Sequence, residues 1–224
     1  MMLELYHSGS RIGRVLSPVP RLEHIMAMHA RKIRRWSTTD VRALMDAARP
    51  WPRLELLGGE LIVTPAPNAA HQIAVLELTR ILADYCDHEH VGVVFNSPAD
   101  LELIAGTISQ PDIFVIPYSV LPVDEERFEW ARVTELRLAV ETISPSSVHT
   151  DRVEKREHYL EAKVEEYWVM DLEARMVERW LAGREGPIAV RDRLTWHPHP
   201  ARDPLLIDLE SFFRGVTVKL KRPG

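Results

Sequence analysis

The chain has 224 residues, of which 46% are apolar and 27% are charged. This balance is ordinary for a globular protein and excludes a chain that is mostly disordered. A single cysteine, Cys86, excludes an intramolecular disulfide and a zinc site built from thiolates. No stretch approaches the roughly 20 apolar residues that a membrane-spanning helix needs, and we find no pattern of a secretory signal. We therefore expect a cytoplasmic protein that does not bind membranes.

The net charge of −5 is unevenly distributed along the chain. Residues 1–50 contain nine Lys or Arg and four Asp or Glu, a balance of +5, so the remaining residues carry a balance of −10. Such an acidic body is not a general nucleic-acid binder, because affinity for phosphates normally needs a basic surface. It does suit a protein that gathers carboxylates around a cation. The basic cluster at residues 31–35 either contacts phosphates or forms a solvated tail.

The chain is predicted to divide into an arm and one domain. Residues 1–33 show no sustained periodicity, so we interpret them as an N-terminal arm and residues 34–224 as a single domain. The first helix of that domain should begin near Ser37, because Ser37 and Asp40 have the spacing of an N-terminal cap.

The rest of the chain alternates between patterns typical of strands and of helices. Gly58-Gly59 between two apolar segments predicts a β-hairpin. Asn68 can cap a long helix in which His71 shares a face with apolar residues. The expected elements are the hairpin at 54–57 and 61–63, helices at 69–87 and 150–163, strands at 93–103, 107–116, 136–143, 166–171 and 176–181, and, after a loop-rich tail from residue 183, a last segment at 205–213. This order predicts an α/β fold with a central mixed sheet flanked by helices.

Two carboxylates fall inside or next to apolar strands. Asp112 directly precedes the apolar run 113–116, and Glu141 lies within the run 138–143. A buried carboxylate is costly unless a cation or hydrogen-bond donors compensate it, and two on neighbouring strands also repel each other. One divalent cation resolves both problems, and oxygen ligands of this kind suit Mg²⁺ or Mn²⁺. The alternative is that each acid lies at a wet strand end or pairs with an arginine.

A lysine follows on the next predicted helix. Asp151, Lys155 and Tyr159 are spaced by four residues and therefore share one helix face. A lysine that points at a metal can orient a water molecule and stabilise the charge of a phosphorane-like transition state. The alternative is an ordinary Asp151–Lys155 ion pair on the helix surface.

These residues resemble a known signature. Pro111-Asp112, then Glu141 after 29 residues, then a lysine, are similar to the PD-(D/E)xK pattern of restriction-endonuclease-like nucleases. More closely, the chain resembles the Uma2 family of bacterial endonucleases, formerly a domain of unknown function. The similar segments, which together span about residues 36–213, are 55–61, Pro65-Ala66-Pro67 with His71, 110–112, 140–146, Asp151 with Lys155 and Tyr159, and 166–171.

The resemblance implies a restriction-endonuclease-like core and an Mg²⁺-dependent (or Mn²⁺-dependent) endonuclease that hydrolyses DNA. It also implies Asp112 and Glu141 as metal ligands, with the main-chain carbonyl of Thr142 as a third. The superfamily lysine usually stands two residues after the glutamate, where this chain has Ile143. In the Uma2 family the lysine comes from the next helix, which here implies Lys155.

Glu60 and His71 are the remaining catalytic candidates. Glu60 follows the glycine turn and could act as an auxiliary metal ligand or hold a water molecule. His71 could carry a proton near neutral pH. A lone histidine is more often structural, so a structural role stays open for His71.

A second hypothesis is a non-catalytic interaction or nucleic-acid-binding module that keeps the nuclease fold. The acidic body and the lack of a clear DNA-reading domain favour it. An enzyme should bind Mg²⁺ or Mn²⁺ through Asp112 and Glu141, whereas such a module need not. A homodimer is an open arrangement for both hypotheses.

Overall fold

A computed structural model describes residues 35–48, 52–64, 66–121, 128–143 and 147–221. All of them belong to the predicted 34–224 domain, whereas the predicted arm at 1–33 lies outside the described residues. The helices are α2 (Thr38–Ala48), α3 (Ala69–Glu89), α4 (Arg156–Glu161) and α5 (Leu209–Lys219), with a π-helical turn, η3 (Thr150–Lys155), before α4 and short 3-10 turns η1 (Tyr118–Val120) and η2 (Trp130–Arg132). The strands are β1 (Arg53–Leu57), β2 (Glu60–Thr64), β3 (Val93–Asn96), β4 (Ile113–Ile116), β5 (Leu138–Ile143), β6 (Glu166–Asp171), β7 (Met176–Leu181), β8 (Ile188–Val190), β9 (Arg193–Trp196) and β10 (Leu205–Asp208).

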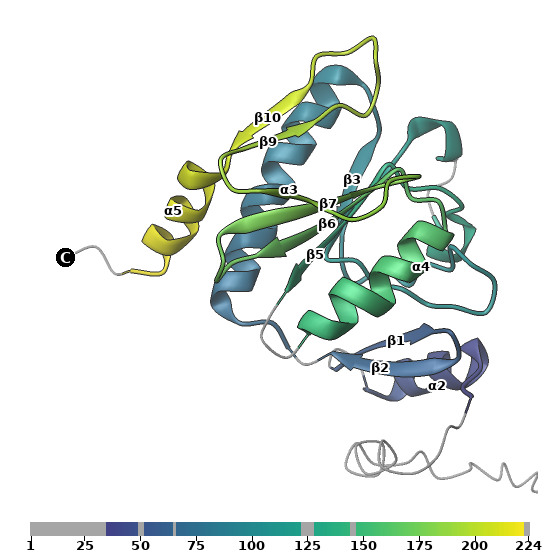
Figure 1. Ribbon diagram of the computed structural model, residues 1–224. Coiled ribbons are helices and arrows are strands. Elements are labelled where there is room, and N and C mark those ends of the chain that lie inside the picture. Colours follow the sequence, from purple (N-terminus) through teal and green to yellow (C-terminus); the bar gives the residue numbers. More distant parts are fainter. Residues whose placement is uncertain (1–34, 49–51, 65, 122–127, 144–146, 222–224) are drawn as a thin grey trace, which may run out of the picture. The chain divides into compact units, whose positions relative to one another are not determined.

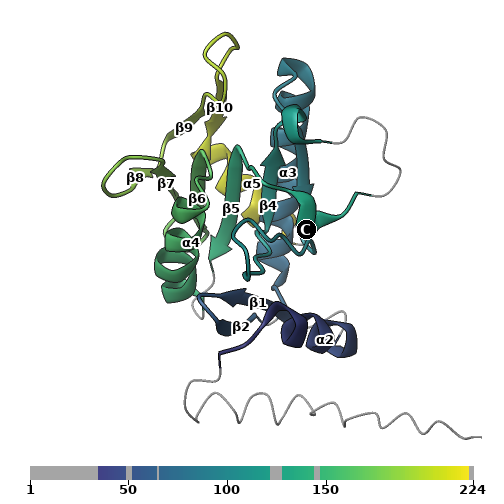
Figure 2. The same cartoon turned by 90° about the vertical axis from the view of Figure 1, so that its right-hand side faces the viewer.

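Six strands form the central sheet in the order β3-β4-β5-β6-β7-β8. Strands β5 and β6 are parallel, and the other neighbouring pairs of this sheet are antiparallel. A parallel pair needs a crossover connection, and here η3 and α4 form it. Helices α3 and α5 lie on one side of the sheet and α4 on the other (Figures 1 and 2). The predicted mixed sheet flanked by helices is therefore confirmed.

Each face of the sheet has its own apolar core, because successive strand residues point to opposite faces. On β5, Leu138 and Val140 pack in the cluster that includes α3 and α5. Ala139 and Ile143 pack in the other cluster, which includes Tyr159 of α4. Any β5 residue with the parity of Ala139 therefore faces α4.

The predicted elements at the start of the domain are confirmed. Ser37 and Asp40 form the expected cap, in which each accepts a hydrogen bond from the other's main-chain N–H at 3.2 Å. Strands β1 and β2 form the hairpin, with Gly58 and Gly59 at φ of 56° and 83°, a left-handed conformation that favours glycine. This two-stranded sheet is separate from the central one. It pairs instead with the segment between β3 and β4, where Ile108 exchanges two main-chain hydrogen bonds of 2.8 Å with Leu56.

Two predicted strands are shorter than expected. Strand β3 ends at Asn96 rather than at residue 103, and β4 begins at Ile113 rather than at residue 107. Pro98 has no N–H to donate to a strand partner, which limits the first strand. Within the intervening segment, Ile108 pairs with the β1–β2 hairpin and not with the central sheet.

The C-terminal region is also more regular than the sequence suggested. The tail predicted as loop-rich contains β8 and β9, because strands of three or four residues are too short for their alternation to stand out between prolines. The predicted segment at 205–213 changes from strand to helix at Asp208, whose side chain accepts a hydrogen bond from Ser211 N at 2.7 Å and caps α5. Among the described residues, no helix has the length and apolar character needed to span a membrane.

Candidate active site

Asp112 and Glu141 come together on the face of the sheet that α4 covers. The antiparallel register pairs Ile113 of β4 with Val140 of β5, so extending it by one residue places Asp112 opposite Glu141. The Thr142 N–H donates a hydrogen bond of 2.9 Å to Asp112 Oδ2. Both acids are almost completely buried, with 4% and 3% exposure. The strand pairing thus brings two carboxylates that are 29 positions apart to one point.

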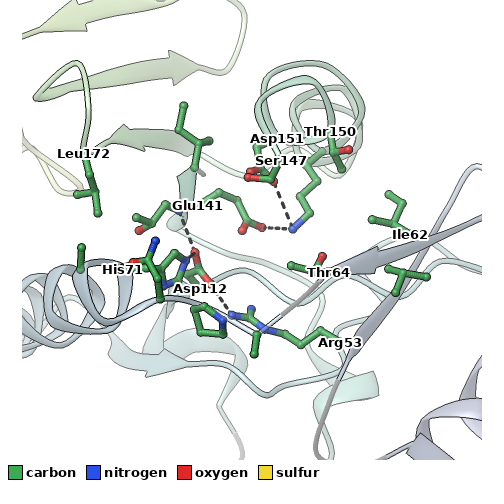
Figure 3. Close-up of a pocket in the computed structure, with 18 of the residues that line it drawn as sticks. Arg53, Ile62, Thr64, His71, Asp112, Glu141, Ser147, Thr150, Asp151 and Leu172 are labelled. Atoms are coloured by element: carbon green, nitrogen blue, oxygen red, sulfur yellow. Dashed lines mark hydrogen bonds and ion pairs between the residues drawn. The ribbon is translucent and has the colours of Figure 1, made fainter. Parts of the chain in front are cut away.

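A cavity of about 580 Å³ opens over this pair. Its walls come from the β1–β2 hairpin, the first turn of α3, the end of β5 and the η3 turn. Figure 3 shows Asp112, Glu141 and His71 converging on it, with Arg53 next to Asp112. Of the predicted site residues, Asp112, Glu141, Thr142, His71 and Lys155 line this cavity.

The Asp112 carboxylate is held by donors on both oxygens. Arg53 Nη2 lies 2.8 Å from Oδ1, and His71 Nε2 lies 2.9 Å from Oδ2, the oxygen that the Thr142 N–H also contacts. Burial alone would raise the pKa of Asp112, but the hydrogen bond and charge of His71 and the charge of Arg53 lower it below its ordinary value. The alternative prediction, that Asp112 pairs with an arginine, is therefore confirmed by its contact with Arg53.

Lys155 is buried with 3% exposure and points into a group of acids. Its Nζ lies 2.8 Å from Glu55, 3.0 Å from Glu141 and 3.5 Å from Asp151. Burial alone would lower the pKa of Lys155, but these carboxylates raise it well above its ordinary value. The Asp151–Lys155 pair exists, but it belongs to a buried cluster and not to a solvated helix surface.

Three carboxylates contact the single ammonium group of Lys155. Burial raises the pKa of Glu141 well above its ordinary value, Lys155 opposes this, and the charges of Asp112, Asp151 and Glu55 add to the rise. Burial likewise raises the pKa of Asp151, against the charge of Lys155. A single ammonium therefore does not compensate the acids that share it.

Sequence reasoning missed Glu55 and Arg53 as members of this site. Glu55 is 1% exposed, and its Oε1 accepts a hydrogen bond of 2.7 Å from the Gln110 N–H while Oε2 contacts Lys155. The signal was present, because Glu55 interrupts the apolar run 54–57 in the same way that Glu141 interrupts its strand. Arg53 carried no comparable signal, since its partner Asp112 lies 59 positions away.

The two remaining candidates lie in different places. His71 is in the first turn of α3, where Asn68 caps the helix by accepting from the His71 N–H at 2.9 Å, and its ring reaches Asp112. Glu60 is exposed at the start of β2 and lines a separate cavity of about 630 Å³ together with Gly58 and Gly59. The structure does not bring Glu60 to the pocket of Asp112.

The pocket offers suitable donors for a divalent cation. No group of three or more His, Cys, Asp or Glu side chains arranged to hold a metal occurs in the part of the chain that the structure describes. The pocket does have the two carboxylates of Asp112 and Glu141, which are hard oxygen ligands. His71 Nδ1 and Thr142 Oγ1 are also buried there without a hydrogen-bond partner among the described residues. Such atoms are rare in folded proteins unless a water or an ion completes them, so the residues present fit a hydrated cation.

The fold and the facing acids define a class, the restriction-endonuclease-like proteins. A sequence profile of the Uma2 family, described as "Putative restriction endonuclease", matches residues 40–220. This match covers most of the chain, so the protein belongs to the Uma2 family.

One solved structure supports the same fold. It is described as the "Crystal structure of a putative nuclease belonging to DUF820 from Anabaena variabilis ATCC 29413", and it superposes with a TM-score of 0.58 at 20% sequence identity, covering 74% of this chain and 92% of that chain. At this identity the similarity shows the fold alone. No curated protein matches the chain in sequence.

Proposed function

We propose that this protein is an Mg²⁺- or Mn²⁺-dependent endonuclease that hydrolyses phosphodiester bonds of DNA. The observation that carries the proposal is the excess of negative charge at the pocket. Among the described residues, four buried carboxylates in or beside this pocket share two permanent cations and one histidine: Glu55, Asp112, Glu141 and Asp151 with Arg53, Lys155 and His71. Uncompensated buried charge is strongly unfavourable. A divalent cation would add the positive charge that allows these carboxylates to be ionised together.

Asp112, Glu141 and the main-chain carbonyl of Thr142 would hold this cation. When bound, the cation would act as a Lewis acid and would activate a water molecule for attack. The roles of the protein follow from the contacts of each side chain. Asp112 enters the reaction ionised, because its donors lower its pKa.

Lys155 has two tasks in this proposal. Lys155 Nζ and the Tyr159 hydroxyl each donate a hydrogen bond of 3.0 Å to Glu141 Oε1. These two bonds orient the Glu141 carboxylate toward the pocket. The Lys155 ammonium also lines the cavity and stabilises the negative charge that develops on the phosphate oxygens in the transition state. Because burial removes competing water, this stabilisation is larger than at a surface.

His71 is the proton carrier in this proposal. Its Nε2 is fixed by Asp112 at 2.9 Å, which leaves Nδ1 in the pocket without a hydrogen-bond partner among the described residues. Nδ1 can exchange a proton with the attacking water or with the leaving oxygen. We assign no step to Glu60, because it is exposed and lines another cavity.

The test is a cleavage assay of the purified full chain on supercoiled plasmid and on single-stranded circular DNA. We expect nicking with Mn²⁺ or Mg²⁺, none with EDTA, and none from Glu141→Gln. Glu166→Gln is a matched control, since Glu166 is also a buried strand glutamate, with 6% exposure, but pairs with Arg179 outside the pocket. Binding of DNA without cleavage under any of these ions would favour the non-catalytic module.

A further inference from the structure

We propose that Arg53 is the internal counter-cation of the metal-free site and a phosphate-binding residue of the loaded one. Its guanidinium would pass from Asp112 to a substrate phosphate when a divalent cation binds, so that metal and phosphate strengthen each other's binding. The inference rests on the proposed function and adds to it a residue that recognises substrate.

The position of Arg53 places it where an incoming anion would arrive. Arg53 is the first residue of β1, its side chain is 11% exposed, and its Nη2 lies 2.8 Å from Asp112 Oδ1. It lines the main cavity and also a smaller adjoining cavity of about 150 Å³, and both cavities share Asp112 and His71. A group that enters from either side therefore meets the Arg53 guanidinium.

The two oxygens of Asp112 differ in a way that sets up a competition. Oδ2 already accepts from the Thr142 N–H at 2.9 Å and contacts His71 Nε2 at 2.9 Å. Oδ1 has the Arg53 contact, so Oδ1 is the oxygen with more room for a metal. A divalent cation on Oδ1 would stand next to a guanidinium in a buried pocket, where like charges repel strongly. Metal and Arg53 therefore compete for the same oxygen.

A second anion that binds the Arg53 guanidinium would relieve the competition between Arg53 and the metal for Asp112 Oδ1. Arg53 Nη1 also donates a hydrogen bond of 3.3 Å to the Gln110 main-chain oxygen, but a guanidinium that leaves a carboxylate needs another anion to balance its charge. Its planar fork matches the oxygens of a phosphate. The phosphate of the substrate is the anion that must enter this cavity for cleavage. Occupation of Arg53 by phosphate then removes the obstacle to metal binding, and by linkage the metal must favour the phosphate equally.

A calorimetric titration measures this coupling without any cleavage. Mn²⁺ is titrated into the full chain alone and with saturating thymidine 3′,5′-bisphosphate, which carries phosphates but no diester to cleave, and free Mn²⁺ is corrected for binding to the bisphosphate. In the wild type we expect the bisphosphate to tighten Mn²⁺ binding about tenfold or more, within the usual range of coupling between sites. In Arg53→Gln we expect Mn²⁺ alone to bind tighter than in the wild type, and the coupling to fall to nearly one.

Two further variants keep the test decisive. Arg179→Gln removes a half-buried arginine of similar exposure, 17%, that pairs with Glu166 and lines neither cavity, so it should keep wild-type affinity and coupling. Arg53→Lys keeps the charge but loses the fork, so Mn²⁺ should bind as in the wild type while most of the coupling is lost. If Arg53→Gln does not fold, Arg53→Lys alone decides the question.

The outcomes separate this inference from the proposed function. Full coupling in both Arg53 variants would overturn the inference while leaving a metal-dependent nuclease in place. A wild type that binds no Mn²⁺ with or without the bisphosphate would overturn both.

Discussion

Two buried glutamates on neighbouring strands of the central sheet have very different surroundings. Glu166 on β6 accepts hydrogen bonds from Arg179 and from the Trp168 indole N–H. Among the described residues, Arg179 forms an ion pair with Glu166 and with no acid of the pocket. Glu141 on β5 accepts from Lys155 and Tyr159, but that lysine also serves two other acids. The two residues are 6% and 3% exposed, so burial does not distinguish them.

The difference teaches that the number of acids per cation, and not burial of an acid, marks the candidate site. Glu166 has the strand parity of Trp168 and Met170, which pack in the core with α3 and α5. Glu141 has the parity of Ala139 and Ile143 and faces the cavity. Glu166 has an arginine of its own, whereas the described residues around Glu141 supply one ammonium to three carboxylates. Three substitutions and one change of pH test whether Glu141 and Glu166 differ in this way.

The largest effect should come from Asp112→Asn. The substitution keeps the shape of the side chain but removes the charge that a divalent ion needs. Cleavage under single-turnover conditions should fall by about a thousandfold, the upper end for loss of one preorganised electrostatic group. Glu166→Gln should leave the rate unchanged. Equal losses in both variants would mean that the effect is on folding and that the pocket is not special.

Lys155→Met should lower single-turnover cleavage by about a hundredfold, because it removes one transition-state charge. The three acids that contact Lys155 then lose their shared cation, so thermal unfolding at neutral pH should occur at a lower temperature. Tyr159→Phe is the control, since it removes a contact of 3.0 Å with Glu141 but no charge. A wild-type rate in Lys155→Met would remove the lysine from the reaction.

The metal-free protein should lose stability as the pH rises above about 4.5. Burial raises the pKa of Glu141 above its ordinary value of 4.5 in the folded protein, so the folded state binds more protons than the unfolded state in the window above 4.5. Stability therefore falls as the pH rises through that window. Glu141→Gln should flatten this fall, whereas Glu166→Gln should not. Melting curves in EDTA between pH 4.5 and 8 measure it, and identical slopes in all three proteins would contradict the assignment.

The smallest effect should come from Glu60→Gln. This residue is exposed and lines another cavity, so the substitution should change stability by no more than about 0.5 kcal/mol and leave cleavage unchanged. A drop in cleavage comparable with that of Lys155→Met would show that the hairpin moves Glu60 to the reacting phosphate.

Local patterns predicted those parts of the fold that depend on near neighbours. The cap at Ser37, the hairpin at Gly58-Gly59 and the strand pair 166–171 and 176–181 all follow from residues a few positions apart. The short strands β8 and β9 were missed, because three or four residues give too little alternation to detect.

The candidate site was predictable where an acid interrupts an apolar strand, as Asp112 and Glu141 do. It was not predictable where the partner is remote in sequence. Arg53 meets Asp112 across 59 positions, and Glu55 of β1 contacts Lys155 at the end of η3. Helix spacing correctly associated Lys155 with Asp151 but gave no sign that two further carboxylates share the same ammonium.

Calorimetric titration of Mn²⁺ into the wild type, Glu141→Gln and Glu166→Gln measures whether the pocket of Asp112 and Glu141 binds a divalent cation. If the excess negative charge of the pocket exists to bind a divalent cation, the wild type and Glu166→Gln should bind one Mn²⁺ per chain with equal affinity. Glu141→Gln should bind at least about tenfold more weakly, a loss of 1.4 kcal/mol or more. Equal Mn²⁺ affinity in all three proteins, or no binding by any of them, would contradict the account.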